Sequence, residues 1–203
     1  YDFYRKIGFE LAGFEESVVF EQEFEAPRHN FVFKQGAQVA PEALLRLYVQ
    51  HSVGTARTAE EVRKYLQIPQ SILHTAWDPK GQLVAYAVEG KGADLTDYVH
   101  EWGGAVTAMV ALMSHLRKQK ARPFTMILPN HSVNLLLTLQ KLPVTTNQGY
   151  LGMIKLLKPE AFFAKIQKAA RSLGVADLVL EVAGHANFRV GLGKDVRTIQ
   201  GER

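Results

Sequence analysis

The sequence predicts an α+β (α/β three-layer) protein, and three features of its pattern support this fold class. Strand-like and helix-like segments follow from residue 30 in the order β-α-α-β-β-β-α-β-α-β. The turn sequence Asp78-Pro79-Lys80-Gly81 lies between two apolar stretches and predicts an antiparallel hairpin. The apolar run at residues 124–128 is typical of a strand covered on both faces.

The first segment predicts one short helix and two strands. Residues 1–7 form the helix, which Gly8 ends because glycine favours the left-handed conformation beyond a helix C-terminus. Phe9 can then fold back on the last turn. Strand patterns follow at residues 9–14 and 17–24. The polar stretch at residues 26–30 contains a proline and marks a boundary.

The next segment predicts a strand, two helices and the hairpin. The strand covers residues 30–34, and Pro41 starts the first helix. Its apolar residues at helical spacing are Leu44, Leu45, Tyr48 and Val49. Thr58-Ala59-Glu60-Glu61 has the form of a capping box and starts the second helix. The hairpin strands are predicted at residues 71–77 and 83–88.

Residues 96–157 predict strands that alternate with helices. Residues 96–102 form a strand with Tyr98, His100 and Trp102 on one side. Gly103-Gly104 leads into a long helix over residues 105–119, and the strand at 124–128 follows. Pro129-Asn130-His131-Ser132 caps a helix over residues 133–142, and strands come around residues 150–157.

The pattern changes after Lys158-Pro159. An amphipathic helix ended by Gly174 precedes two strands, at residues 178–182 and 188–192, which Gly184-His185-Ala186-Asn187 joins. The chain begins inside a helix without an initiator Met and ends just after a strand pattern. We therefore expect an internal piece of a longer protein, in which this last unit is incomplete.

Composition excludes several kinds of chemistry. The 203 residues include no Cys, which excludes thiolate nucleophiles and cysteine-based metal centres. The seven His form no H-x-H or H-E-x-x-H pair, so no metal site is expected. No apolar run approaches the roughly 18 residues of a membrane span, so we expect a soluble, cytoplasmic protein with no membrane partner.

The charge pattern does not indicate nucleic-acid binding. The net charge is +4, and the one dense basic cluster is Arg117, Lys118, Lys120 and Arg122. These cations lie where a helix ends, so we expect them to offset its dipole and to keep the surface soluble. No aromatic residues interleave with them to stack on bases.

A motif at the N-terminus resembles a known enzyme family. Phe3-Tyr4-Arg5-Lys6-Ile7-Gly8-Phe9-Glu10 is similar to the FY-x-K-x-GF ending of GCN5-related N-acetyltransferases (GNATs). The element order from residue 30 also resembles a GNAT lobe. The resemblance implies a mixed, mostly antiparallel sheet flanked by helices. It makes residues 1–26 the end of a first lobe and residues 27–157 a second, degenerate lobe. Residues 158–203 resemble the start of a sterol-carrier-protein-like unit that follows tandem lobes in some bacterial acetyltransferases.

The resemblance implies transfer of an acetyl group from acetyl-CoA to the amine of a small molecule or peptide, with acetyl-CoA bound mainly by the first lobe. Tyr4 matches the family tyrosine that protonates the departing thiolate. A phenol with a pKa of about 10 stays protonated at neutral pH and can donate to sulfur. Phe3 would contact the pantetheine arm. Alternatively, Tyr4 and Phe3 only pack at the helix end.

The second lobe lacks both features that the family uses for acyl-CoA. Aligning Lys141 with Lys6 places Leu139 opposite Tyr4, so the general-acid hydroxyl is missing. His100-Glu101-Trp102-Gly103-Gly104-Ala105-Val106 stands where the family has its Q/R-x-x-G-x-G/A pyrophosphate loop, although the two glycines leave room for an anion. We expect residues 27–157 to have lost acyl-CoA chemistry and to shape the first lobe's substrate site.

Two alternatives stay open. A glutamate at a strand end can serve as a general base, but the commoner case for Glu101 is a surface carboxylate. Trp77, Trp102 and Tyr98 either line a ligand groove or, more commonly, belong to the core. The whole chain is either part of an acetyltransferase or a non-catalytic module that binds a ligand or partner. The sequence indicates no oligomeric state.

Overall fold

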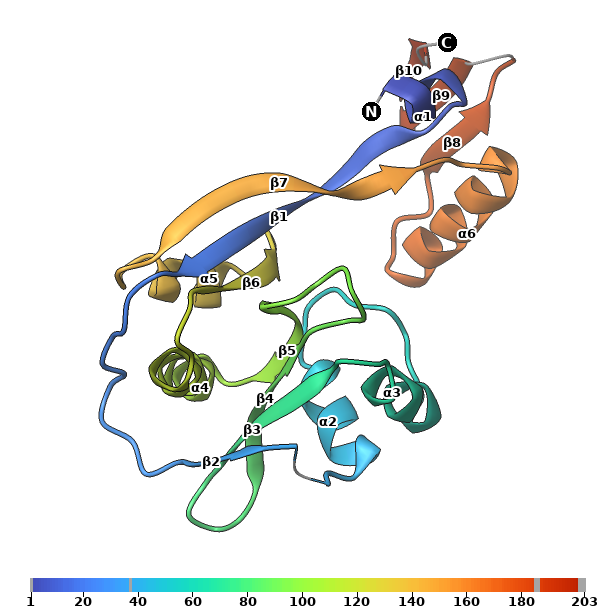
Figure 1. Ribbon diagram of the computed structural model, residues 1–203. Coiled ribbons are helices and arrows are strands. Elements are labelled where there is room, and N and C mark those ends of the chain that lie inside the picture. The colour runs from blue at the N-terminus through green and yellow to red at the C-terminus, as the bar shows by residue number, and fades with distance from the viewer. Residues whose placement is uncertain (1, 37, 185–186, 201–203) are drawn as a thin grey trace. The chain divides into compact units, whose positions relative to one another are not determined.

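The computed structural model describes residues 2–36, 38–184 and 187–200, which form six helices and ten strands within those ranges (Figure 1). In chain order these are α1 (Asp2–Lys6), β1 (Glu10–Phe20), β2 (Val32–Gln35), α2 (Pro41–Tyr48), α3 (Ala59–Leu66), β3 (Ile72–Trp77), β4 (Leu83–Glu89), β5 (Tyr98–Gly104), α4 (Val106–Gln119), β6 (Phe124–Pro129), α5 (Val133–Leu139), β7 (Thr145–Ile154), α6 (Pro159–Ser172), β8 (Leu178–Val182), β9 (Asn187–Leu192) and β10 (Asp195–Gln200). The chain divides into two compact units, residues 13–151 and residues 1–12 together with 152–203.

The larger sheet is mixed and mostly antiparallel, as predicted. Its strand order is β2-β3-β4-β5-β6-β1-β7. The pairs β2 with β3, β3 with β4, β4 with β5 and β1 with β6 are antiparallel, whereas β5 and β6 run parallel. The parallel register joins Tyr98 to Thr125 and Val99 to Met126, and it ends there. The remaining residues of β5 and β6 therefore separate.

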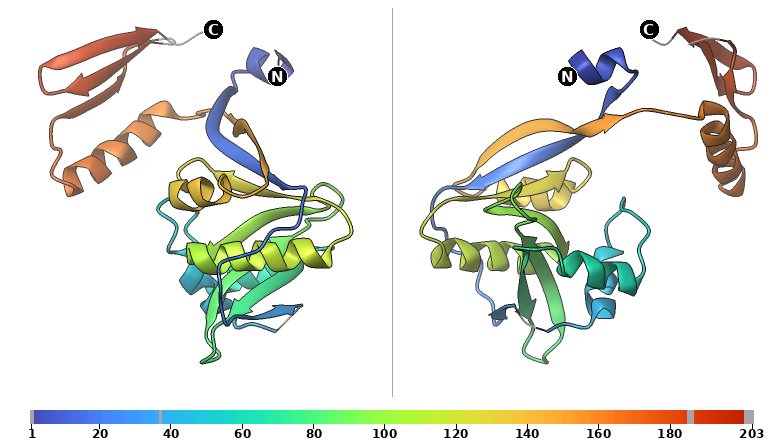
Figure 2. Two further views of the ribbon diagram at one scale, coloured as in Figure 1. Left: turned by 90° about the vertical axis from the view of Figure 1, so that its left-hand side faces the viewer. Right: turned by 45° about the vertical axis from the view of Figure 1, so that its right-hand side comes forward.

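Helices cover both faces of this sheet around β4 (Figure 2). On one face α4 is buried along its length against the small side chains Ala85 and Ala87. On the other face Leu44 of α2 and Val62 of α3 pack with Tyr86. This alternation along β4 confirms the three-layer prediction. One detail of the prediction for α2 was wrong. Val49, expected on the apolar face of this helix, is 64% exposed, and Leu47 is buried instead.

The local signals of the hairpin and of α3 are confirmed. The Asp78 carboxylate accepts hydrogen bonds from the backbone amides of Lys80 and Gln82, and Gly81 has a φ of +75°. These contacts fix the turn between β3 and β4. Thr58 caps α3 through the reciprocal bonds with Glu61 that the sequence predicts.

Four predicted strands differ from the structure. One continuous strand, β1, replaces the two predicted at residues 9–14 and 17–24. Glu15 and Glu16 do not break it, because they pair with Pro129 and Leu128 of β6. Strand β6 alternates buried and half-buried residues, so its apolar run is not covered equally on both faces. The strand expected around residues 150–157 begins earlier, at Thr145.

The unit of residues 1–12 and 152–203 contains α1, α6 and a sheet of order β10-β9-β8. Gly8 ends α1 with a φ of +83°, and the Phe9 amide donates back to the Tyr4 carbonyl, as the sequence predicts. Gly174 ends α6 with a φ of +86°. The predicted turn between β8 and β9 includes residues 185 and 186, which lie outside the described residues.

The basic cluster at the end of α4 forms ion pairs, and the dipole argument did not predict these pairs. Lys120 Nζ lies 2.6 Å from a carboxylate oxygen of Glu89 and 3.1 Å from one of Asp97. Glu89 is buried and also lies 3.1 Å from Nε2 of His74. Burial alone would raise the pKa of Glu89, but the hydrogen bonds and charges of His74 and Lys120 outweigh burial and lower it. Lys120, one residue of this cluster, therefore holds a buried carboxylate within the fold.

Candidate functional site

The separation of β5 from β6 creates the gap in which a ligand is most readily accommodated. Open sheets bind ligands at the carboxyl ends of parallel strands. Here Trp102, which is only 8% exposed, fills the gap, and its indole Nε1 donates to the Ile127 carbonyl at 3.2 Å. The indole thus joins the two strands beyond the point where their backbone pairing ends.

A cavity of about 540 Å³ lies beside this indole. Its walls come from the end of α2 and the segment before α3, from β5, from β6 and the turn after it, and from β7. The lining residues are Tyr48, His51, Val53, Gly54, Thr55, Arg57, His100, Glu101, Trp102, Ile127, Pro129, His131 and Leu151. All of them belong to the unit of residues 13–151.

A mostly buried ion pair forms one wall of this cavity. Arg57 Nη1 donates to Glu101 Oε2 at 2.6 Å, and the two side chains are 14% and 13% exposed. Tyr86 Oη donates to the other Glu101 oxygen at 3.4 Å. Two tyrosine rings, Tyr48 and Tyr65, flank the guanidinium at 4.2 and 4.5 Å from their centroids.

The charge of Glu101 shifts the pKa values of both Arg57 and Tyr86. Burial alone would lower the pKa of Arg57, but the hydrogen bond and charge of Glu101 outweigh burial and raise it. Burial raises the pKa of Tyr86, and the Glu101 charge adds to that rise. Glu101 is therefore not the surface carboxylate that the sequence favoured. Its oxygens accept from Arg57 and Tyr86, so its role in this arrangement is to anchor Arg57.

Three histidines also line the cavity. His51 Nε2 donates to the Trp102 carbonyl at 2.8 Å, and its ring meets the indole edge-on. His100 Nε2 donates to the Gly90 carbonyl at 2.9 Å. His131 Nε2 is buried without a hydrogen-bond partner. Among the residues that the structure describes, no three His, Asp or Glu side chains are grouped as metal ligands.

Two half-buried histidines, His100 and His115, predict a pH dependence of stability. Burial lowers the pKa of His100 and His115 from the ordinary value of 6.5. The unfolded chain then binds protons more readily than the folded one, so the free energy of unfolding falls as pH drops below about 6.5. We expect a double variant, His100→Gln with His115→Gln, to lose less stability between pH 7.5 and 5.

Urea titrations at a series of pH values measure this slope. The range ends above 4.5, the ordinary pKa of a glutamate, and the lowered pKa of Glu89 contributes stability that is lost only at more acid pH. The same slope in the double variant and the unsubstituted chain contradicts the assignment to these two histidines.

Gly103 and Gly104 have packing roles instead of the anion-binding role considered above. A Cβ on Gly103 would lie 2.7 Å from the Tyr86 ring, and one on Gly104 would lie 2.3 Å from the Val84 carbonyl oxygen. Strand β5 ends at Gly104 and α4 begins at Val106. A single residue between them leaves no loop to cradle a pyrophosphate.

Tyr4 and Phe3 lie on α1, in the unit of residues 1–12 and 152–203. Tyr4 is 52% exposed and Phe3 is 70% exposed. The Tyr4 ring contacts Phe3 and Phe9 edge-on, at 5.4 and 5.8 Å between centroids. Exposure suits a role at a binding surface, and the ring contacts suit helix-end packing, so both predictions stand. Leu139, the aligned position, is fully buried at the end of α5.

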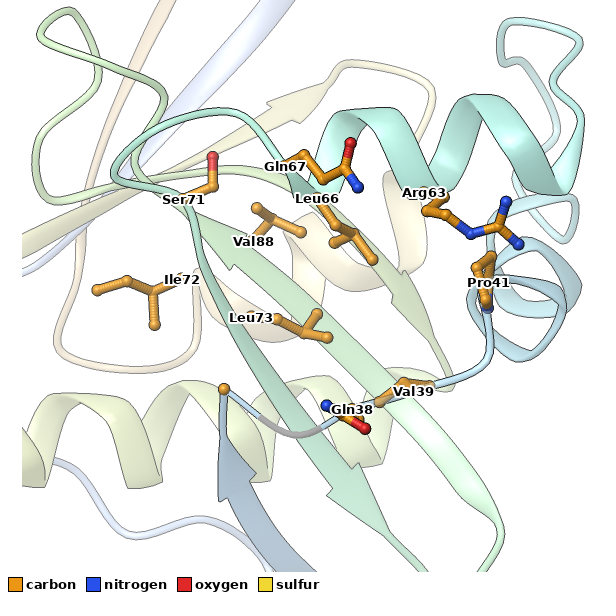
Figure 3. Close-up of a pocket in the computed structure, with 11 residues that line it drawn as sticks. Gln38, Val39, Pro41, Arg63, Leu66, Gln67, Ser71, Ile72, Leu73 and Val88 are labelled. Carbon is orange, nitrogen blue, oxygen red and sulfur yellow. The ribbon is translucent and has the colours of Figure 1, made fainter.

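A larger cavity of about 830 Å³ adjoins α3 and β3 (Figure 3). Leu66, Leu73 and Val88 contribute aliphatic surface to it. Arg63 is its one charged side chain among the described lining residues, and it pairs with Glu60 at the surface. This cavity offers an apolar surface without acid–base groups. The cavity beside Trp102 is therefore the better candidate for chemistry or specific recognition.

Comparisons with known proteins identify the fold. No protein-family model and no curated protein match the sequence. A protein from Enterococcus faecalis, described as of unknown function and a probable N-acyltransferase, matches 100% of this chain with a TM-score of 0.58 at 13% identity. A GCN5-related N-acetyltransferase from Anabaena variabilis matches 100% of it with a TM-score of 0.51 at 12% identity.

The match covers 56% of each of these two proteins, so the chain spans about half their length. Likeness at such low identity establishes the fold alone. No helix among the described residues is long and apolar enough to cross a membrane.

The sheet topology and these structural matches together show that the chain has a GNAT-like α+β fold, with a mixed seven-stranded sheet flanked by helices and a separate three-stranded sheet.

Proposed function

We propose that this chain is part of an acetyl-CoA-dependent N-acetyltransferase that acts on a small-molecule or peptide amine. In this proposal residues 27–157 are a non-catalytic lobe, and transfer takes place on a first lobe that ends with residues 1–26. The GNAT-like fold and the motif from Phe3 to Glu10 support the enzyme class. The observation that carries the division of labour is Trp102, whose indole occupies the gap between β5 and β6.

Two further features of residues 27–157 support a non-catalytic role. Both carboxylate oxygens of Glu101, the candidate general base, already have partners, since Arg57 donates to one at 2.6 Å and Tyr86 donates to the other at 3.4 Å. The position aligned with Tyr4 is Leu139, which has no hydroxyl and lies in the core. This lobe would thus contribute shape and support to the substrate site of the first lobe.

Tyr4 would supply the proton that the thiolate leaving group of acetyl-CoA takes up. Acetyl-CoA brings the acetyl group as a thioester, and the amine forms the new C–N bond as the C–S bond breaks. Tyr4 Oη would donate its proton to the departing thiolate, acting as a general acid. A base of the first lobe would accept the proton that the amine nitrogen loses, and the Tyr4 oxygen would regain a proton from solvent after the thiol leaves. Phe3, next to it on α1, would contact the pantetheine arm through its exposed ring.

We expect Tyr4→Phe in the full-length protein to lower kcat by about 100-fold or more, because general-acid catalysis typically contributes at least that much. KM for acetyl-CoA should change little, since only the hydroxyl is removed. Steady-state kinetics with an amine acceptor measure both constants. Tyr150→Phe, at another exposed tyrosine, is the matched control and should leave kcat unchanged. An unaltered kcat in Tyr4→Phe removes Tyr4 from the mechanism.

The second candidate function is a non-catalytic module that binds a ligand. The cavity of about 540 Å³ with its buried ion pair favours this candidate, since it is a formed site that acyl transfer does not use. An acetyltransferase assay on the full-length protein separates the two functions. Acetylation of an amine supports the enzyme, and its absence across a broad set of amines supports the binding module.

A further inference from the structure

We propose that the cavity beside Trp102 binds a neutral small molecule that combines an amide or ketone carbonyl with an apolar body. This site goes beyond the acetyl transfer proposed above and does not depend on it. The cavity lies wholly within residues 13–151, and its volume of about 540 Å³ falls within the range of roughly 300–1,000 Å³ typical of small-molecule sites.

The apolar part of the ligand is indicated by one side of the cavity. Trp102 contributes its indole, and Ile127 and Pro129 extend that surface along β6. Val53 and Leu151 add aliphatic side chains from two other segments. An aromatic or branched aliphatic group would bury its surface here at a favourable transfer free energy.

The polar part of the ligand is indicated by buried nitrogen atoms that lack partners. Arg57 Nε and His131 Nε2 are both buried and without a hydrogen bond in the structure. Buried polar groups are nearly always paired, so each unpaired one calls for a partner. The Nε of arginine can only donate, so its partner must be a hydrogen-bond acceptor.

The charges around the cavity indicate that the acceptor is neutral. The positive charge of Arg57 is already offset by Glu101 at 2.6 Å. Both His51 and His100 use a ring nitrogen to donate to a backbone carbonyl, so neither of these nitrogens is free to bind an anion. A carboxylate would be repelled by Glu101, and an ammonium would be repelled by Arg57 and has no acceptor to offer. A carbonyl oxygen avoids both penalties.

Three probes with one phenylpropyl body test this choice: 3-phenylpropanamide, 3-phenylpropanoate and 3-phenylpropylammonium. The chain has two Trp, so Trp77→Phe leaves Trp102 as the fluorescent reporter in the cavity wall. We expect the amide to give a saturable fluorescence change with a Kd of about 1 mM or tighter. Each charged analogue should bind at least about 10-fold more weakly. No saturation by the amide up to about 10 mM, or tighter binding of a charged analogue, overturns the proposal.

Substitutions at Arg57 and His131 test whether the amide binds at the two unpaired nitrogens. Arg57→Lys keeps the charge opposite Glu101 but removes the planar donor fork, so the Kd for 3-phenylpropanamide should rise about 10-fold. His131→Phe keeps a ring but removes Nε2, and it tests the same contact independently. Arg63→Lys is the matched control on α3 and should leave the Kd unchanged. Thermal melts verify that each variant is folded.

An unchanged Kd in both Arg57→Lys and His131→Phe, with the fold intact, overturns the assignment of this cavity. None of these titrations uses acetyl-CoA, so their outcome is distinct from that of the Tyr4→Phe kinetics. The two proposals can therefore fail separately.

Discussion

Gly104→Ala should lower the free energy of unfolding of residues 13–151 by about 3 kcal/mol or more. Gly104 has a φ of +131°, a backbone conformation that residues other than glycine rarely adopt. Its added Cβ would lie 2.3 Å from the Val84 carbonyl oxygen and 2.6 Å from the Ala85 Cα. Both atoms belong to the β4 backbone, so relief requires β4 and β5 to separate. Urea denaturation measures the loss.

Gly149→Ala is the matched control for this prediction. Gly149 lies on β7, and a Cβ there would meet no atom within 4 Å. We expect a change in stability of less than about 0.5 kcal/mol. If Gly104→Ala is as well tolerated as Gly149→Ala, the close packing of β5 against β4 is not as described, and the glycines regain an anion-binding explanation.

Glu101→Ala should destabilise the same unit by about 3 kcal/mol, because it leaves the Arg57 guanidinium mostly buried without its counter-charge. A double variant, Arg57→Met with Glu101→Leu, removes both charges and should recover most of that loss, since paired buried ions can be replaced by apolar side chains of similar volume. The difference between single and double variants isolates the cost of the unpaired charge.

Glu60→Ala provides the exposed counterpart. Glu60 pairs with Arg63 on α3, and both side chains are about half exposed, at 56% and 51%. Exposed pairs contribute about 0–1 kcal/mol, so this variant should have a small effect. Equal losses for Glu101→Ala and Glu60→Ala, measured by urea denaturation, contradict the view that the Arg57–Glu101 pair is a buried structural element.

Local signals explain which parts of the fold the sequence could predict. The Asp78 turn, the Thr58 capping box and the Gly8 helix end each depend on residues within a few positions of one another. Their hydrogen bonds form within the segment itself, so the residue types specify the geometry. The same holds for α4, whose apolar pattern is dense enough to require burial.

Long-range contacts explain what the sequence could not predict. Arg57 and Glu101 lie on segments separated by α3, β3 and β4, and nothing near either residue indicates the other. Glu101 therefore resembled an ordinary surface carboxylate. Similarly, β1 stays continuous through Glu15 and Glu16 because β6 supplies their backbone partners. Burial and pairing of this kind depend on the tertiary fold.

The aromatic residues of β5 show how far sequence alternation can predict the surroundings of side chains within one strand. Alternation predicted that Tyr98, His100 and Trp102 share a face of the strand, but the pairing with β4 shifts register between Val88 and Glu89, and Val99 packs in the same core cluster as Trp102. Alternation also did not indicate that β5 and β6 separate after Val99, which places Trp102 beside a cavity while its indole bridges the gap. The two options left open for Trp102, core or groove, both apply.

Calorimetric titration of acetyl-CoA into this chain tests most directly the claim that residues 27–157 have lost acyl-CoA chemistry. Because Trp102 fills the gap and a single residue separates β5 from α4, we expect no saturable heat up to about 1 mM acetyl-CoA. Saturable binding with a Kd of about 10 μM or tighter would contradict the account, because this lobe would then still hold the cofactor.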